Sequence, residues 1–538
     1  MRLAYWMYQG TAHYGIGRIA NSLRNIHAVF HAPQGDAYIN AVFAMLERTP
    51  AFPPLTTSVV SGRDLAQGNL RLPETLQAID QQLHPELIVV AASCSTTLLQ
   101  ENLEVAAESA DISAEVLIYD VNPYRVQEVA AADGLFTELV RRYATATPLT
   151  TQPSVNILGP ASMGLHARHD LTALRRMLQT LGVQVNVVAP WGATLDDLRR
   201  LPAAWLNIAP YRELGQQAAQ VLHEQFGTPS LCDAPIGVQP TLAWLHQLVE
   251  QLNSVGSKQN NPSEVMLPPL TAFSLDGLST PSSVPWFVRT ADMESFSRRR
   301  MFVFGDATHV AGMTRFLHDE LGTQICGAGT YLPDQADWLR EQLAEYVDDL
   351  LVTEEFQVTA QRIEELQPDL VCGTQMERHT ARKLGLQCMV IAPPMHIENH
   401  PLSYRPFLGF DGADVIADQI YMTSTLGMEQ HLIDMFGDAG LEVPPMPETE
   451  PVLPLVDPVL PAVPLTEESP TPAAPVKGAP LADDEPVEWQ PDAEAMMKKI
   501  PFFVRNKARR NIEQYARAQG YRVITTQIVL EAREHVGG

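Results

Sequence analysis

Short apolar runs that end in small or polar residues recur along the first 440 residues of the chain. Six of them cover residues 86–92, 115–120, 155–159, 183–188, 301–305 and 370–373. Helical patterns follow these runs, and mostly apolar strands that alternate with helices are typical of parallel sheets covered on both faces. The pattern therefore predicts an α/β protein whose ligands lie beyond the carboxyl ends of its strands.

The runs group into three predicted α/β domains, over residues 1–150, 151–285 and 286–440. The composition then changes, because residues 441–491 hold fourteen of the chain's 42 prolines. Such a segment cannot form a packed core. We expect an extended linker that is semi-rigid where proline is dense.

A small helical module is predicted over residues 492–538. Asp492 is suited to cap a short helix, Gly520 ends the next one, and a last helix can begin near Thr526. The middle helix is basic and carries Arg505, Lys507, Arg509, Arg510 and Arg517. On an acidic chain this helix suggests contact with an acidic surface or a ligand carboxylate; the alternative is a face that is merely solvated.

The overall charge and the absence of several motifs exclude classes of function. A net charge of −26 disfavours nucleic acids and anionic membranes as partners. No apolar run approaches the roughly 18 residues of a transmembrane helix. The N-terminus lacks the apolar core of a signal peptide, so the expected location is the cytoplasm. The sequence contains no HExxH, Walker A or GxSxG pattern, and so no zinc-protease, ATPase or serine-hydrolase signature.

The five cysteines are widely spaced and form no CxxC pair. Their number is odd, which favours a reducing compartment over a disulfide framework. Local spacing therefore gives no standard four-thiolate iron–sulfur site. The cysteines are Cys94, Cys232, Cys326, Cys372 and Cys388.

Residues Gly15–Ala20 read GxGxxA, and Asp36 follows Gly15 by 21 positions, as in a dinucleotide-binding fingerprint. That fingerprint must follow a strand directly, whereas polar residues occupy positions 9–14. A helix that begins with glycines is the favoured interpretation. A nicotinamide dehydrogenase is kept as an alternative.

Several further residues could carry chemistry. Asp36 follows a tight Pro-Gln-Gly turn, Cys94 lies just beyond an apolar strand where a helix begins, and Asp292 precedes a helical pattern. Each has a structural alternative: a turn aspartate, a buried inert cysteine and a helix cap. The turn Gly305–His309 could hold an anion or be an ordinary strand-to-helix turn. His396, between prolines and apolar residues, could line a pocket.

Six segments in order resemble one family, the B subunits of light-independent protochlorophyllide reductase. They read MRLAYWMYQGTAHYGIGRI, HAPQGDAY, AASCSTTL, FGDATHVAGM, GTQMERH and KKIPFFVRNKARRNIEQYA. The resemblance spans the whole chain apart from the proline-rich linker. It implies three nitrogenase-like, Rossmann-type domains with parallel sheets, in agreement with the three predicted units.

The resemblance also implies a cofactor and partners. Family members form a heterotetramer of two N and two B subunits with a [4Fe-4S] cluster at each N–B interface. Three cysteines of the N subunit and one aspartate of the B subunit hold the cluster, and the matching residue is Asp36. Electrons come from an ATP-hydrolysing iron–sulfur L protein, a homodimer that is reduced by ferredoxin. Cys94 matches a cluster ligand of the related nitrogenase subunit, but in this family the position is not a ligand.

The implied reaction is reduction of the C17=C18 double bond of ring D in protochlorophyllide, a step of (bacterio)chlorophyll biosynthesis. The family's proton donor matches Asp292, although Val288 and Ala291 depart from the residues expected beside it. A substrate contact matches Gly427 and Met428. Two alternatives remain open: another nitrogenase-like subunit, such as the chlorophyllide reductase type, and a non-catalytic assembly scaffold.

Overall fold

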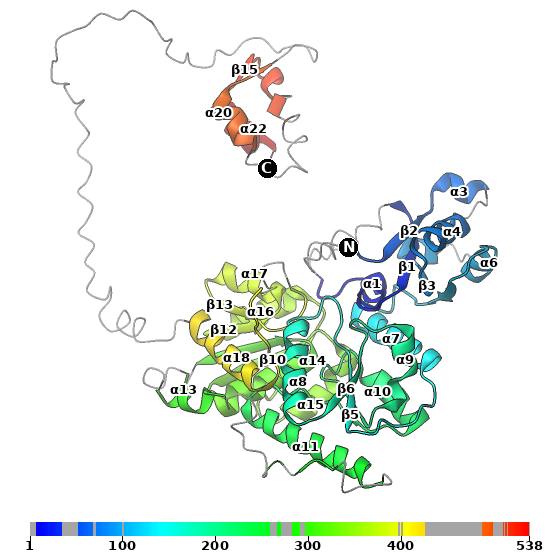
Figure 1. Ribbon diagram of the computed structural model, residues 1–538. Helices are drawn as coiled ribbons and strands as arrows, with labels where there is room; N and C mark the ends of the chain where they lie inside the picture. Colours follow the sequence, from blue (N-terminus) through cyan, green and yellow to red (C-terminus); the bar gives the residue numbers. More distant parts are fainter. Residues whose placement is uncertain are drawn as a thin grey trace, which may run out of the picture. The chain divides into compact units, whose positions relative to one another are not determined.

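The computed structural model describes most of the chain in detail (Figure 1). The described residues are 7–34, 52–67, 71–98, 102–258, 266–268, 270, 282–290, 296–297, 299–395, 399, 402–424, 487–498, 509, 512–513 and 515–536. The chain divides into two compact units, Met1–Glu442 and Val443–Gly538, each described by itself below.

The first sheet of the larger unit is parallel, with the strand order β2-β1-β3-β4. Residues alternate between its faces: Phe30 and Val89 pack toward one set of helices, and Val29 and Val90 toward the other. This two-sided burial is why the strands read as continuous apolar runs. The strands are β1 (Ile26–Ala32), β2 (Leu55–Val59), β3 (Leu87–Ala92) and β4 (Glu115–Ile118). The helices are α1 (Ala12–Ser22), α3 (Gly62–Gln67), α4 (Leu72–Leu83), α5 (Cys94–Thr97), α6 (Leu103–Glu108) and α7 (Glu128–Tyr143).

The GxGxxA segment lies inside α1, and the described residues directly before this helix, 7–11, form none of the strands. The dinucleotide fingerprint is therefore absent, and the interpretation as a glycine-containing helix is confirmed. Gly15 instead allows close helix packing, since a Cβ atom there would lie 2.1 Å from the carbonyl oxygen of Glu128 in α7.

The second sheet is also parallel, in the order β6-β5-β7-β8. Its strands are β5 (Ser154–Leu158), β6 (Gln184–Ala189), β7 (Leu206–Ile208) and β8 (Ser230–Leu231). Its helices are α8 (Ala167–Thr180), α9 (Leu195–Arg199), α10 (Gln216–Phe226) and α11 (Val238–Gly256), with a 3₁₀ turn at Leu201–Ala203.

The third sheet has five parallel strands in the order β11-β10-β9-β12-β13. They are β9 (Arg300–Gly305), β10 (Gln324–Thr330), β11 (Leu350–Val352), β12 (Leu370–Gly373) and β13 (Gln387–Val390). Its helices are α13 (Val284–Thr290), α14 (Ala307–Arg315), α15 (Ala336–Leu343), α16 (Phe356–Leu366), α17 (Gln375–Leu384) and α18 (Gly409–Thr423). A π-helical turn at Phe316–Glu320 continues α14, and a 3₁₀ turn covers Pro333–Gln335.

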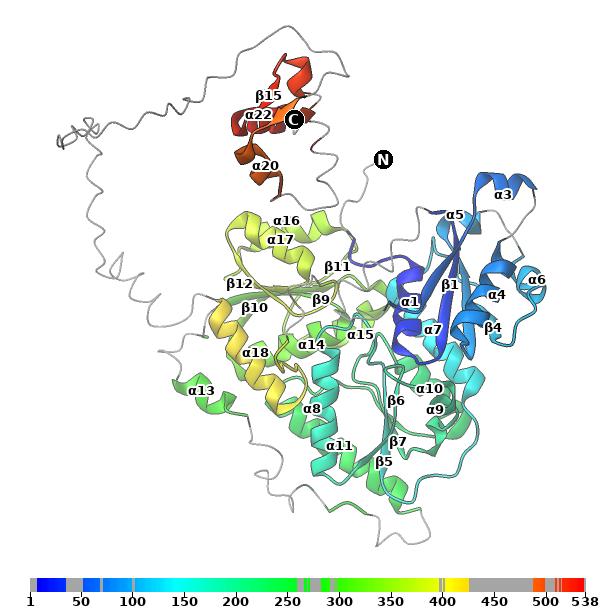
Figure 2. The ribbon, with the colours of Figure 1, turned by 45° about the horizontal axis from the view of Figure 1, so that its top comes forward.

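Neighbouring sheets share hydrophobic cores, the first with the second and the second with the third. Helix α18, near the end of this unit, packs alongside α8 and α11 of the second sheet (Figure 2). The carboxylate of Asp170 in α8 accepts backbone hydrogen bonds from Phe407 (2.6 Å) and Leu408 (3.1 Å), immediately before α18. Because these contacts join segments far apart in sequence, the larger unit holds together as one body. The described part of the chain contains no helix long and apolar enough to cross a bilayer.

The C-terminal unit has its own small core, which includes Ala516, Ile524 and Ile528. A helix begins at Thr526 as predicted (α22, Thr526–Val536), after α20 (Pro491–Lys498). The prediction of a purely helical module is incomplete. Two short strands, β14 (Glu488–Trp489) and β15 (Val523–Ile524), pair in parallel, and two-residue strands are too short to leave a periodic signal.

Candidate functional site

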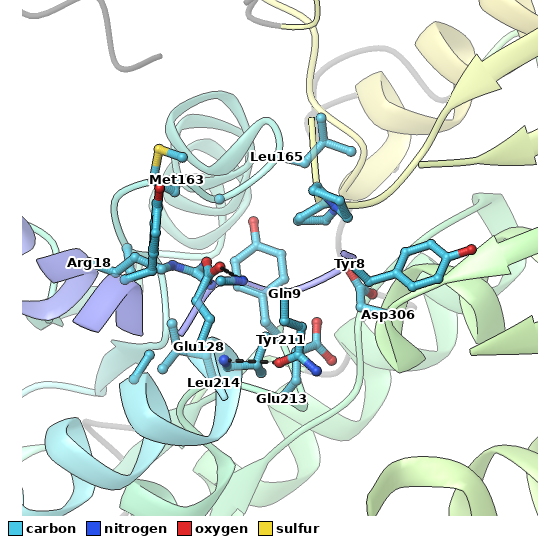
Figure 3. Close-up of a pocket in the computed structure, with 18 of the residues that line it drawn as sticks. Tyr8, Gln9, Arg18, Glu128, Met163, Leu165, Tyr211, Glu213, Leu214 and Asp306 are labelled. Carbon is cyan, nitrogen blue, oxygen red and sulfur yellow. Dashed lines mark hydrogen bonds and ion pairs between the residues drawn. The ribbon is translucent and has the colours of Figure 1, made fainter. Parts of the chain in front are cut away.

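A cavity of about 340 Å³ lies within the larger unit, where the second and third sheets meet α1 and α7 (Figure 3). Residues just beyond three strand ends line it: Gly159 after β5, Asp306 after β9 and Tyr331 after β10. This is where parallel sheets place their ligand sites. The wall also contains apolar side chains, including Met7, Met163, Leu165, Leu214 and Met395.

An ion pair closes the side of the cavity formed by the first sheet's helices. Arg18 of α1 lies 3.3 Å from Glu128 at the start of α7 (Figure 3), and its Nε donates to the carbonyl oxygen of Ser162 (3.0 Å). Glu128 also accepts a hydrogen bond from the backbone of Gly10 (2.9 Å). The pair thus joins the N-terminal segment, α1, α7 and the loop after β5.

On the opposite side, two carboxyl groups and an imidazole come together. Asp306 caps α14 by accepting from the backbone N–H of His309 (2.8 Å), and its other oxygen lies 2.8 Å from the His309 Nδ1. Glu213 follows β7 and accepts from the Thr308 hydroxyl (2.7 Å). Each of Glu213, Asp306 and His309 has one atom that can bind a metal ion, and these three atoms lie within 4.8 Å of one another.

Burial and the charge of Asp306 raise the pKa of Glu213. Burial alone would lower the pKa of His309, but the Asp306 and Glu213 carboxylates outweigh it and raise the pKa to about 9. The side chain of Asp306 occupies the helix N-terminus at this turn, where an anion would otherwise bind. Of the two interpretations of Gly305–His309, the structure therefore supports the ordinary strand-to-helix turn and not the anion site.

The predicted site residues Asp36, Asp292, Gly427 and Met428 all lie outside the described residues, as does His396. Their roles therefore stay predictions. The structure does describe the elements that precede them, and these elements form two regions of the larger unit.

The first region is the carboxyl edge of the first sheet. Strand β1, which leads toward Asp36, and β3, which leads into Cys94, are hydrogen-bonded neighbours. The Ser93 backbone N–H donates to the carbonyl oxygen of His31 (3.0 Å). Cys94 is the first residue of α5, as predicted, and its carbonyl oxygen accepts from the Tyr124 hydroxyl (2.7 Å).

The other four cysteines lie elsewhere in the larger unit. Cys326, Cys372 and Cys388 belong to strands of the third sheet, and Cys232 follows β8 of the second. Burial raises the pKa of the Cys372 thiol to about 12. The described cysteines thus do not gather as a four-thiolate ligand set.

The second region is the pair of helices α13 and α18, which precede Asp292 and Gly427. The ring of Phe287 lies 5.5 Å from Tyr421 and 5.8 Å from the buried Phe296, measured between centroids. Two large apolar side chains on these helices are exposed, Trp286 (63%) and Met422 (81%). The described residues thus give this region an aromatic core, with one exposed apolar side chain on each helix.

Several residues of the cavity are not among the candidates that the sequence suggests, notably Tyr8, Arg18, Glu128 and Glu213. The strand before Glu213, β7, has only three residues and leaves little periodic signal. Tyr8 and Glu128 are brought in by contacts across more than a hundred residues, which no local pattern encodes.

Comparison with solved structures shows the fold, and a family model shows the class of protein. The chain resembles a structure described as nitrogenase Cp1 at pH 6.5, with a TM-score of 0.62 and 17% identity, covering 79% of this chain and 95% of that one. A family model described as nitrogenase component 1 type oxidoreductase matches residues 11–425. Fold and family model together define a nitrogenase component 1 type oxidoreductase, a class that implies iron–sulfur clusters and partner subunits.

A second model, described as proto-chlorophyllide reductase 57 kD subunit, matches residues 489–533. Relatives named as the B subunit of light-independent protochlorophyllide reductase align over the full length of both chains. They include proteins of Chloroflexus aggregans (63% identical), Roseiflexus sp. strain RS-1 (61%) and Chloroherpeton thalassium (60%). The chain belongs to the family of light-independent protochlorophyllide reductase B subunits.

Proposed function

We propose that this chain is the B component of an oxidoreductase that reduces the ring D C17=C18 double bond of protochlorophyllide to give chlorophyllide a. One observation carries the proposal: relatives that bear this enzyme's name align end to end at 57–63% identity. The match includes the C-terminal unit, which has its own family model. A chlorophyllide reductase subunit or an assembly scaffold is less well supported, since the relatives named above are neither.

The cofactor proposed is a [4Fe-4S] cluster shared with an N subunit, with Asp36 as the ligand from this chain. The scattered positions of the described cysteines support ligands from a partner. The neighbouring ends of β1 and β3 support a ligand segment at that edge of the first sheet. Such a cluster, when bound, supplies electrons one at a time.

The assembly proposed is a cytoplasmic heterotetramer of two N and two B subunits. A homodimeric L protein hydrolyses ATP and delivers electrons that originate in ferredoxin. The lack of a Walker A pattern in this chain supports ATP chemistry on another subunit. The proposed domains are 1–150, 151–285 and 286–440, followed by the linker predicted over 441–491 and the module predicted over 492–538. Because β14 (Glu488–Trp489) pairs with β15 and α20 begins at Pro491, the module starts a few residues earlier than predicted.

Asp292 is proposed as the proton donor, and Gly427 with Met428 as substrate contacts. The packing of α13 against α18, with Trp286 and Met422 exposed, supports an apolar ligand surface beside both segments. A carboxyl group held in apolar, water-poor surroundings has a raised pKa and keeps a proton that it can donate near neutral pH.

The test is anaerobic co-expression with an N subunit, followed by iron analysis and turnover with the L protein, ATP and reductant. Chlorophyllide formation is measured by absorption. Asp292→Ala should keep iron and pigment binding but lose turnover by roughly 10²–10⁴-fold, the usual contribution of a general acid. Asp36→Ala should lower or alter the iron content while the chain still folds.

A matched control is Asp337→Ala, since this exposed aspartate forms a surface ion pair with Arg340. It should leave iron content and turnover unchanged. No chlorophyllide from the wild-type complex would overturn the proposed activity. Normal turnover of Asp292→Ala, or full iron content in Asp36→Ala, would overturn the corresponding residue assignment.

A further inference from the structure

Two side chains of α18 hold the part of the chain that leads to the proposed proton donor. The first is the partly buried Asp414, whose Oδ1 accepts hydrogen bonds from the Ser282 hydroxyl (2.6 Å) and the Ser283 backbone N–H (2.9 Å). Both serines directly precede α13, and the Ser282 hydroxyl oxygen accepts in turn from the backbone N–H of Val284, the first residue of that helix (3.1 Å). Asp414 therefore ties the start of α13 to α18.

The second side chain is Tyr421, seven residues after Asp414 and so on the same face of α18. Its ring centroid lies 5.5 Å from that of Phe287 in α13 and 6.1 Å from that of Phe296, which is 1% exposed. The centroids of Phe287 and Phe296 are 5.8 Å apart. The three rings form one cluster, so Tyr421 contacts the chain both before and after residues 291–295.

Covalent geometry limits how far the proposed site residues can lie from these contacts. Asp292 follows Thr290, the last residue of α13, by two positions. Because each residue spans at most about 3.6 Å, the Asp292 Cα lies within roughly 7 Å of the Thr290 Cα. By the same reasoning, the Gly427 Cα lies within roughly 11 Å of Ser424, which follows α18. The distance between proton donor and substrate contact therefore depends on how α13 and α18 are joined.

We infer that Asp414 and Tyr421 are positioning residues for the proposed reduction, because they hold α13 against α18 and so set the place of the Asp292 carboxyl relative to bound pigment. The inference rests on the proposed function and adds two residues that act through Asp292. Proton transfer is sensitive to such placement, since a displacement of about 1 Å can lower a rate by roughly 10²-fold. Loss of either contact lowers kcat more than it weakens pigment binding.

The test uses the complex with the N subunit and compares Asp414→Ala and Tyr421→Leu, which keeps apolar bulk without the ring, with the wild type. We expect kcat per iron to fall at least about tenfold, while iron content is kept and protochlorophyllide affinity stays within about threefold. Asp414→Asn keeps an oxygen that can accept both hydrogen bonds, so it should restore most of the wild-type kcat.

A double-mutant cycle separates positioning from a general structural effect. If Asp414 acts through Asp292, adding Asp414→Ala to Asp292→Ala should lower the residual kcat by less than about twofold, since the donor that it places is already gone. A further tenfold loss in the Asp292→Ala background would mean that the effect does not run through the donor, and the inference would be overturned.

The matched control is Asp418→Ala, because Asp418 is an exposed carboxylate one turn further along the same helix. It should leave kcat unchanged. The inference is also overturned if folded Asp414→Ala and Tyr421→Leu turn over at the wild-type rate, or if Asp414→Asn is no better than Asp414→Ala.

A milder variant decides the question if Asp414→Ala fails to fold. Ser282→Ala removes one hydrogen-bond donor and leaves the carboxylate in place. It should lower kcat at least about threefold in the wild type and not in the Asp292→Ala background; an unchanged kcat in the wild type overturns the inference. A wild-type complex that forms no chlorophyllide overturns the proposed function itself, which is a different result from normal turnover in these variants.

Discussion

At the scale of single residues, two glycines set the geometry beside the cavity. Gly159 after β5 has φ +108°, and a Cβ atom there would lie 2.1 Å from the carbonyl oxygen of Leu214. Gly215 before α10 has φ +110°, and its added Cβ would lie 2.9 Å from the carbonyl carbon of Leu158. The two backbones thus cross at a distance that only glycine allows, which fixes the loop that carries Glu213.

Replacing Gly159 should therefore destabilise the larger unit severely. Gly159→Ala adds a backbone clash to an unfavourable φ, and we expect a loss of more than about 2 kcal/mol in urea unfolding. Gly182→Ala is the control, because Gly182 has φ +73° but no atom of the described residues lies within 4 Å of an added Cβ. It should cost only about 1 kcal/mol. Equal losses in both variants would show that the backbone crossing does not matter.

The sequence allowed some residues of the cavity to be singled out and not others. Asp306 and His309 could be noticed because they follow a clear apolar strand. The pairing with Glu213 could not, because that contact depends on how two sheets meet, and no local pattern records it. Asp36, Asp292, Gly427 and Met428 rest on resemblance to a family, and the experiments above test them.

At the scale of elements, the N-terminal segment is fixed to α17 by a buried hydrogen bond. The Tyr8 hydroxyl donates to Glu377 (2.6 Å), and its ring stacks on Tyr331 at a centroid distance of 5.1 Å. Glu377 also accepts from the Thr374 backbone N–H (2.8 Å) and hydroxyl (2.6 Å), which closes a capping box at the start of α17. A buried carboxyl group thus serves both as a helix cap and as an anchor for residues far away in sequence.

Removing that hydroxyl should lower stability without disturbing the ring packing. Tyr8→Phe leaves the buried Glu377 short of one donor, and we expect a loss of about 1–3 kcal/mol in the free energy of unfolding. Tyr346→Phe removes a solvent-exposed bond to Asp319 (2.8 Å) and serves as the control, with a loss below about 1 kcal/mol. If the unfolding midpoint of Tyr8→Phe is the same as that of the wild type, the hydrogen bond to Glu377 makes no net contribution to stability.

The apolar runs predicted the strands well because burial on both faces leaves a continuous signal. The runs at 86–92, 155–159 and 301–305 became β3, β5 and β9. Strands of two or three residues, such as β7 and β14, carry too few positions for any period to stand out. Tertiary hydrogen bonding, rather than local propensity, determines them.

At the scale of the whole molecule, one of the basic residues of the C-terminal unit forms ion pairs within that unit. Arg509 pairs with Glu513 (3.2 Å) and Glu494 (3.7 Å) and lies over the ring of Trp489 at 5.0 Å. That arginine helps to hold the unit together, so it is less suited to a distant acidic surface than the sequence suggested.

Because the C-terminal unit has its own core, its removal should leave the larger unit intact. A chain ending at residue 442 should keep its melting temperature within about 2 °C, measured by calorimetry. If the unit also handles pigment, the truncated complex should bind protochlorophyllide more weakly than the full chain does, with the larger difference at low salt. Loss of the main thermal transition would contradict the independence of the two units.

The core shared by the second and third sheets also constrains how the chain is made. Helix α18, which spans Gly409–Thr423, covers apolar surface on α8 and α11, whose residues are synthesised more than 150 positions earlier. A growing chain therefore leaves the ribosome with that surface bare until the segment near residue 423 emerges. Chains halted before that point should aggregate or bind chaperones, although each earlier sheet already has its strands.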